Sequence, residues 1–147
     1  MSEPAMRRQS DRNKDLMDRF YAEVVNGGKL DVIDELLAPD FVEHEEVPGL
    51  PKDREGVKQF FGMFRAAFPD VTFTVEAAIA ENDLVAARVT IRGTHQGEFM
   101  GIPATGRAVE LQAMDLVQFA DGAATAHWGV TDMVAMLTQL GVMPEPG

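Results

Sequence analysis

The chain has 147 residues, a net charge of −11 at pH 7 and no cysteine. The length favours one domain, and the lack of thiols excludes disulfides, thiolate metal sites and cysteine nucleophiles and fits a reducing compartment. Thirteen scattered basic residues face 24 acidic ones, so nucleic acid and membrane are poor candidate partners. Without a signal peptide or a run of ~20 apolar residues, the sequence predicts a cytoplasmic protein.

Helical periodicity dominates the first half of the chain. The polar residues 1–10 are predicted to be a disordered tail, a single domain covers residues 11–141, and residues 142–147 form a second tail. Inside the domain, apolar residues recur every three or four positions. The segments with this pattern run from Asp11 to the Asn26-Gly27-Gly28 stop, from Leu30 to Leu37 and from Val57 to Phe68.

The hydrophobic period then changes to two, which indicates strands. The alternating segments are 71–75, 85–95, 108–119 and 123–131, and a short helix at 132–140 with Gly141 as its C-cap follows. Three helices followed by an antiparallel meander predict the α+β class. A curved antiparallel sheet wrapped around the N-terminal helices would form a cone-shaped α+β barrel with an apolar cavity suited to a small molecule.

His95 has the same strand parity as the apolar residues of segment 85–95 and lies at the open end of that face. One interpretation is a general base or hydrogen-bond donor in a pocket, because imidazole titrates near neutrality. The other is a histidine at the end of a strand that bonds to backbone. The strand alone does not separate the two interpretations.

Asp115 lies inside an apolar strand, where a buried carboxylate needs a partner. It is either a solvent-facing residue or an acid/base with a shifted pKa. A two-residue loop at Asp121-Gly122 would place Asp115 opposite Trp128, whereas a three-residue loop with a glycine bulge would place it opposite His127. Only the second register makes an Asp115–His127 pair on one face.

Other chemistries find little support in the sequence. The three histidines and Asp115 lack zinc-site spacing, and no metal is expected. A serine triad is not expected, because the only serines, Ser2 and Ser10, lie in the predicted tail. His44 is flanked by acids and fits a surface position, and Tyr21 on the first helix can offer a phenol to a cavity or lie at the core margin.

Several motifs together resemble a known family. They are DFVEHE at 40–45, GTHQGEFMGIPATGR at 93–107, FADG at 119–122, HWGVTD at 127–132 and MLTQLG at 136–141. The combination is similar to the SnoaL-like polyketide cyclases, in the wider group that includes ketosteroid isomerase and scytalone dehydratase. The resemblance covers about residues 11–141. It implies an α+β barrel with a helix-capped apolar cavity, usually as a homodimer, and an intramolecular aldol condensation without cofactor or metal.

The resemblance also implies roles for particular positions. His95 would close the cavity rim, and the following loop would form an apolar lip that includes Phe99 and Ile102. The acid/base aspartate of the cyclases lies two residues after the position of His127, where this chain has Gly129, and its histidine partner lies where this chain has Asp115. By analogy with ketosteroid isomerase, His44 and Tyr21 can take the parts of base and carbonyl-polarising phenol.

Two function classes follow from these features. The first is a cofactor-independent cyclase-type enzyme acting on a small apolar carbonyl compound by cyclisation or a related proton transfer, with Asp115 as acid/base and His95 and His127 sharing the proton. The second is a non-catalytic binding protein of the same fold, which Gly129 favours; a structural, dimerising domain with a filled cavity is a third alternative. The residues expected to line the pocket are Tyr21, His44, Phe60, Phe61, Phe99, Ile102 and Trp128.

Overall fold

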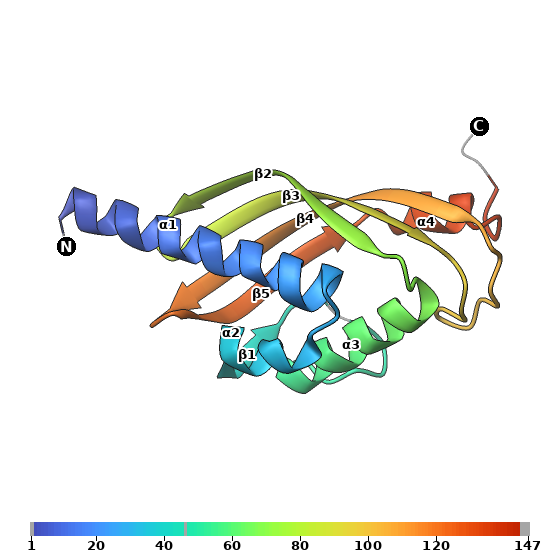
Figure 1. Cartoon of the computed structure of the whole chain (residues 1–147), viewed down its shortest axis with the longest axis horizontal. Coiled ribbons are helices and arrows are strands. Elements are labelled where there is room, and N and C mark those ends of the chain that lie inside the picture. The colour runs from blue at the N-terminus through green and yellow to red at the C-terminus, as the bar shows by residue number, and fades with distance from the viewer. Residues whose placement is uncertain (1, 46, 145–147) are drawn as a thin grey trace.

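A curved five-stranded sheet arches over helices that pack on one of its faces (Figure 1). The computed structural model describes residues 2–45 and 47–144. The strand order is β1-β5-β4-β3-β2, so the two edge strands are β1 and β2 and the sheet is unclosed. The mixed α+β class predicted from the sequence is confirmed, and the sheet curves around the helices without completing a barrel.

The first helix is longer than its periodicity predicts. Helix α1 (Glu3–Arg19) starts at an N-cap in which the Ser2 side chain accepts a hydrogen bond from the Ala5 N–H at 3.3 Å. Residues 3–10 are therefore helical and do not form the predicted disordered tail; the last residues of the other predicted tail, 145–147, lie outside the described residues. The helix continues as a π-helix, η1 (Phe20–Asn26), which carries the buried Tyr21.

Short helices complete the layer beneath the sheet. They are η2 (Leu30–Val32), α2 (Ile33–Leu36) and α3 (Arg54–Ala67), and α4 (Met133–Gln139) lies at the end of the sheet away from the N-terminus (Figure 1). Asp53 caps α3 by accepting from the Gly56 N–H at 3.1 Å. Across the described part of the chain, no helix combines the length and apolar character needed to cross a bilayer.

The strands are β1 (Leu37–Glu43), β2 (Thr72–Glu81), β3 (Leu84–Thr94), β4 (Ala108–Ala120) and β5 (Ala123–Thr131). Strands β2 to β5 form the antiparallel meander that the alternating pattern predicts. Strand β1 pairs in parallel with β5, which places the FVEHE segment beside the last strand. This pairing connects residues more than 80 positions apart, and no local sequence signal indicates it.

A β-bulge decides the register between β4 and β5, and both registers expected from the sequence are wrong. The turn has two residues, Asp121 and Gly122, with φ of 51° and 80°, as in a type I′ turn. The pairing then shifts, because Gln118 pairs with Ala126 after Phe119 has paired with Ala124, so Thr125 is the extra residue of a bulge. As a result Asp115 faces Gly129, and neither Trp128 nor His127 lies directly opposite it.

The bulge nevertheless places Asp115 and His127 on one face. His127 pairs with Val117, so it is a diagonal neighbour of Asp115 across the strands. The same face of β4 carries Val109, Leu111 and Ala113, each at most 4% exposed, which pack in the core. The concave face of the sheet therefore changes from apolar core to polar site along a single strand.

Candidate active site

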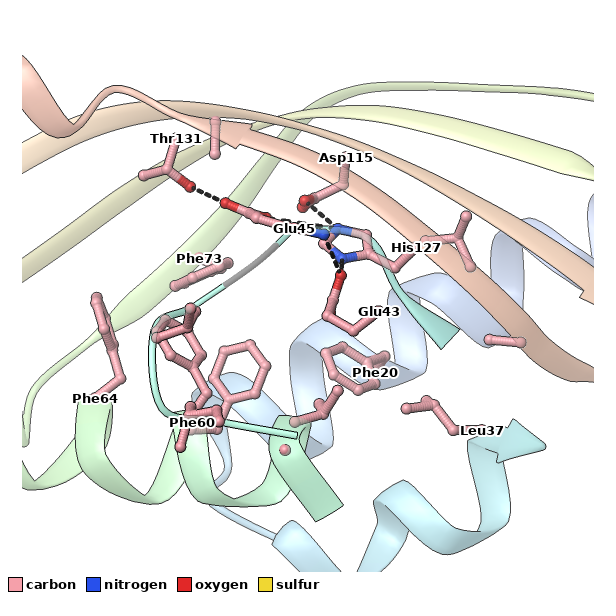
Figure 2. Close-up of a pocket in the computed structure, with 18 of the residues that line it drawn as sticks. Phe20, Leu37, Glu43, Glu45, Phe60, Phe64, Phe73, Asp115, His127 and Thr131 are labelled. Carbon is pink, nitrogen blue, oxygen red and sulfur yellow. Dashed lines mark hydrogen bonds and ion pairs between the residues drawn. The ribbon is translucent and has the colours of Figure 1, made fainter. Parts of the chain in front are cut away.

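A pocket of about 260 Å³ lies between the concave face of the sheet and the helices beneath it. Its wall is largely aromatic, with side chains from η1, α3, β2 and the loop after β3: Phe20, Phe60, Phe61, Phe64, Phe73 and Phe99. Polar side chains gather against the sheet, above this apolar floor (Figure 2). Such a pocket suits an apolar molecule that carries a few polar groups at one end.

Four side chains form a continuous hydrogen-bonded network at the polar end. Tyr21 donates its phenol O–H to Asp115 Oδ2 at 2.6 Å, and Asp115 Oδ1 lies 2.8 Å from His127 Nε2. The other ring nitrogen, Nδ1, lies 2.6 Å from Glu43 Oε1. The network joins η1, β4, β5 and β1, and the Asp115–His127 pair that the sequence raised as one alternative is present (Figure 2).

The network fixes His127 as a cation at neutral pH. Burial lowers the pKa of His127, but hydrogen bonds to the Asp115 and Glu43 carboxylates raise it by more than burial lowers it, and the pKa is about 10. The three side chains are only 14–19% exposed, so water screens these interactions weakly. Both ring nitrogens of His127 therefore carry protons and donate to the flanking carboxylates.

Tyr21 remains a hydrogen-bond donor throughout the physiological pH range. Burial, followed by the neighbouring Asp115 carboxylate, raises the pKa of its phenol above the ordinary value. The phenol thus keeps its proton and donates it to Asp115. Both oxygens of Asp115 consequently accept a hydrogen bond, one from Tyr21 and one from His127.

Glu45 is the third carboxylate beside His127. Its Oε2 accepts a hydrogen bond from the Thr131 hydroxyl at 3.1 Å, and its Oε1 lies 3.9 Å from His127 Nε2. Its backbone N–H donates to Glu43 Oε1 at 3.0 Å, which fixes the chain at the end of β1. Burial raises the pKa of Glu45, the Asp115 and Glu43 charges add to the rise, and His127 and Thr131 oppose it.

The same groups offer ligand atoms to a metal ion. Atoms of Glu45, Asp115 and His127 lie within 4.8 Å of one another. A bound cation would need the Nε2 lone pair of His127, and that nitrogen instead carries a proton directed at Asp115. A bound cation would therefore have to displace this proton and its hydrogen bond to Asp115.

His95 lies outside the pocket lining, and the structure does not bring it together with Asp115 and His127. Its ring is fully buried and stacks on Phe68 with centroids 5.3 Å apart. Nδ1 accepts from the Thr105 N–H at 3.2 Å, and the backbone N–H of His95 donates to Arg107 at 2.9 Å. His95 therefore joins the two ends of the loop between β3 and β4, and Phe99 of that loop reaches the pocket.

Three other predicted lining residues lie elsewhere. His44 and Trp128 are exposed on the outer face of the sheet, where their rings stack in parallel at 4.7 Å. Strand alternation explains their position, because each directly follows an inward-facing residue, Glu43 or His127. Ile102 closes a tight turn by bonding to Phe99 and is absent from the lining. Tyr21, Phe60, Phe61 and Phe99 do line the pocket.

Sequence reasoning missed two carboxylates that the structure places in the site, Glu43 and Glu45. Only His44 of the segment FVEHE was predicted to lie at the site, although strand alternation puts its two flanking glutamates together on the opposite face. The alternation of this short strand was a usable signal for the direction in which the glutamates point. The pairing of β1 with β5, which brings both glutamates to His127, has no such signal in the sequence.

The fold and site define a small α+β protein with an acid/base network at the end of an apolar pocket. The model of the SnoaL-like polyketide cyclases matches residues 15–140, and the chain belongs to this family. Nogalonic acid methyl ester cyclase of Streptomyces nogalater is 29% identical over 118 residues, which cover 79% of this chain and 88% of that protein. Aklanonic acid methyl ester cyclase DauD of Streptomyces sp. (strain C5) is 30% identical over 129 residues, covering 84% and 78%.

Solved structures agree with the family assignment. IdmH of Streptomyces antibioticus superposes with a TM-score of 0.77 at 41% identity, covering 88% of this chain and 99% of that chain. The fold and the family expected from the sequence motifs are thus confirmed.

Proposed function

We propose that this chain closes a ring in a small polyketide by intramolecular aldol condensation, without a cofactor, with Asp115 and His127 as its acid/base pair. The observation that carries the proposal is the network Tyr21–Asp115–His127–Glu43, set at the polar end of an aromatic pocket. An aldol closure needs a base beside an acidic carbon and a wall that folds the substrate chain on itself. The network offers the base and the phenylalanines offer the wall.

The proton inventory of such a reaction is simple. The Asp115 carboxylate takes a proton from a carbon that neighbouring carbonyls acidify, and the resulting enolate carbon forms a bond to a second carbonyl of the same molecule. That carbonyl becomes an alkoxide, which must receive one proton to give the hydroxyl product. Tyr21 and the cationic His127 hold Asp115 in position, and His127 stabilises negative charge that develops nearby.

The names of the relatives suggest the substrate class to test. We propose a polyketide methyl ester, because the relatives are named as cyclases of aklanonic and nogalonic acid methyl esters. The purified chain, treated with EDTA, is incubated with each ester and the products are separated by chromatography. Ring closure that survives the chelator supports the proposal, and binding without turnover supports the alternative of a ligand-binding protein.

Asp115→Asn tests the assignment of the base. The amide keeps the shape and the hydrogen bond from Tyr21 but cannot accept a proton, so kcat should fall about 100-fold or more. The melting temperature and ester binding, measured alongside, show whether the variant remains folded and loaded. A folded Asp115→Asn variant that retains wild-type kcat contradicts the role of Asp115.

We also propose that the chain forms a homodimer through the outer face of the sheet. One row of paired residues crosses four strands on this face: Ile79, Ala86, Leu116 and Trp128. Ile79 is 74% exposed and Val130, in the next row, 73%, so the surface is apolar and uncovered in a single chain. Light scattering should give twice the mass of the chain, and the monomer mass in Trp128→Glu.

A further inference from the structure

Gly129 has no conformational reason to be glycine. It lies in the extended strand β5 and is absent from the glycines with positive φ. The space around it gives a different reason: a Cβ at this position would overlap Glu45 Oε1 and lie 2.8 Å from His127 Cε1 and Nε2. The place of a side chain on β5 is therefore occupied by a carboxyl group that comes from the end of β1.

The Glu45 carboxyl is held from one side only. Thr131 fixes Oε2, whereas Oε1 makes no hydrogen bond to any residue that the structure describes, and His127 Nε2 at 3.9 Å is its nearest charged partner. Asp115 differs, since Tyr21 and His127 occupy both its oxygens. Both carboxyls line the pocket, and of these two only Glu45 has an oxygen that makes no hydrogen bond to the described residues.

We propose that Glu45 is the second catalytic carboxyl of this site, the acid that protonates the alkoxide formed when the ring closes. This inference rests on the function proposed above. An aldol closure needs proton transfers at two atoms, the carbon that is deprotonated and the oxygen that is protonated. Two carboxyl groups near the same imidazolium nitrogen, Nε2 of His127, match this requirement.

The proton balance closes through His127. Asp115 gains a proton from the substrate carbon, and Glu45 loses one to the substrate oxygen. His127 then passes its Nε2 proton to Glu45 Oε1 and takes the proton of Asp115 across the existing 2.8 Å hydrogen bond. Each group returns to its starting state, and no other reactant is needed.

The environment of Glu45 agrees with a role as acid. Burial raises its pKa, and the charges of Asp115 and Glu43 act in the same direction against His127 and the Thr131 hydroxyl. The groups that face the cluster are thus Tyr21 from η1, Glu43 from β1, Asp115 from β4 and His127 and Thr131 from β5. These surroundings keep Glu45 protonated to a higher pH than an ordinary glutamate.

The kinetic test compares Glu45→Gln with wild type on the ester that wild type closes. Loss of the acid should lower kcat about 100-fold with KM changed less than about threefold, and should remove the high-pH limb of the kcat profile. Glu81→Gln, an exposed position at the end of β2, is the matched control and should behave as wild type.

Two outcomes separate this inference from the function on which it rests. If Asp115→Asn is inactive but Glu45→Gln keeps kcat within about threefold of wild type, Glu45 is not the acid and the cyclase function stands. If wild type closes no ester, the cyclase function itself is contradicted.

A measurement that needs no turnover completes the test. The Glu45 carboxyl, assigned in a ¹³C-glutamate spectrum by its absence from Glu45→Gln, should titrate above the exposed glutamates. It should move toward them in Gly129→Ala, which displaces the carboxyl. Titration of Glu45 together with the exposed glutamates in wild type overturns the proposal.

Discussion

Two histidines of this fold, His127 on β5 and His95 directly after β3, have opposite surroundings. His127 lies between two carboxylates and carries a positive charge at neutral pH. His95 lies against Phe68, and its Nδ1 accepts a hydrogen bond from a backbone N–H, while its buried Nε2 has no partner among the described residues. One imidazole is built into a proton network, and the other is built into the packing of a loop.

The comparison shows that strand parity predicts burial but not chemistry. Both histidines were predicted to share the catalytic proton, His95 because of its strand parity and His127 because one hairpin register pairs it with Asp115. The deciding factor is what the adjacent elements bring: β1 brings carboxylates to His127, whereas α3 and the 96–107 loop bring aromatic and backbone groups to His95. A histidine acts as a proton carrier only where a neighbour can exchange that proton.

The largest expected effect is on turnover by His127→Asn. The substitution removes the cation that holds Asp115 and the path between the two carboxyls, so kcat should fall about 100-fold or more. His95→Asn, assayed in parallel on the same ester, should keep kcat within about tenfold of wild type. Equal losses in the two variants would abolish the distinction between them.

A smaller effect, on stability, should appear in His95→Ala. The ring is fully buried and stacked, and its removal leaves a cavity and an unpaired Thr105 N–H. The free energy of unfolding should fall by about 2–4 kcal/mol, as measured by urea denaturation at pH 7. A loss below about 1 kcal/mol would show that the loop does not depend on this ring.

The subtlest test is the pH dependence of stability. The folded state raises the pKa of His127 from 6.5 to about 10. Its contribution to the free energy of unfolding is therefore complete below pH 6.5 and is lost as the pH rises through about 10. Denaturation of wild type and His127→Asn at pH 6.5, 8 and 10 should show their difference in stability shrinking with pH, and parallel curves would contradict the raised pKa.

Much of the fold is predictable because its elements are locally specified. The bounds of β5 and the C-terminal helix follow from alternation, the Asp121-Gly122 turn and the Gly141 cap. The start of α1 is not predictable in this way, because residues 3–10 lack an apolar stripe. Their helix depends on the Ser2 cap and on the helical turns that follow. The parallel pairing of β1 with β5 depends on contacts between distant segments, which a local pattern does not contain.

The site is only half predictable for the same reason. Asp115, His127 and Tyr21 are recognisable as polar residues on apolar faces, and the structure brings them together. Glycine at position 129 was interpreted as the loss of the acid/base aspartate of the cyclases, and as support for a non-catalytic binding protein. The sequence cannot show that another strand end delivers Glu45 to the space this glycine leaves.

The bulge at Thr125 has a consequence for how such a sheet can change by insertion and deletion. Deleting Thr125 would restore regular pairing and leave every later pair in place, so His127 and Gly129 would still face the pocket. Regular pairing of the full-length strand would instead place Trp128 opposite Asp115, and the later residues of β5 would change sides. The gene can thus lose three nucleotides at this position without exchanging the interior and the exterior of the strand.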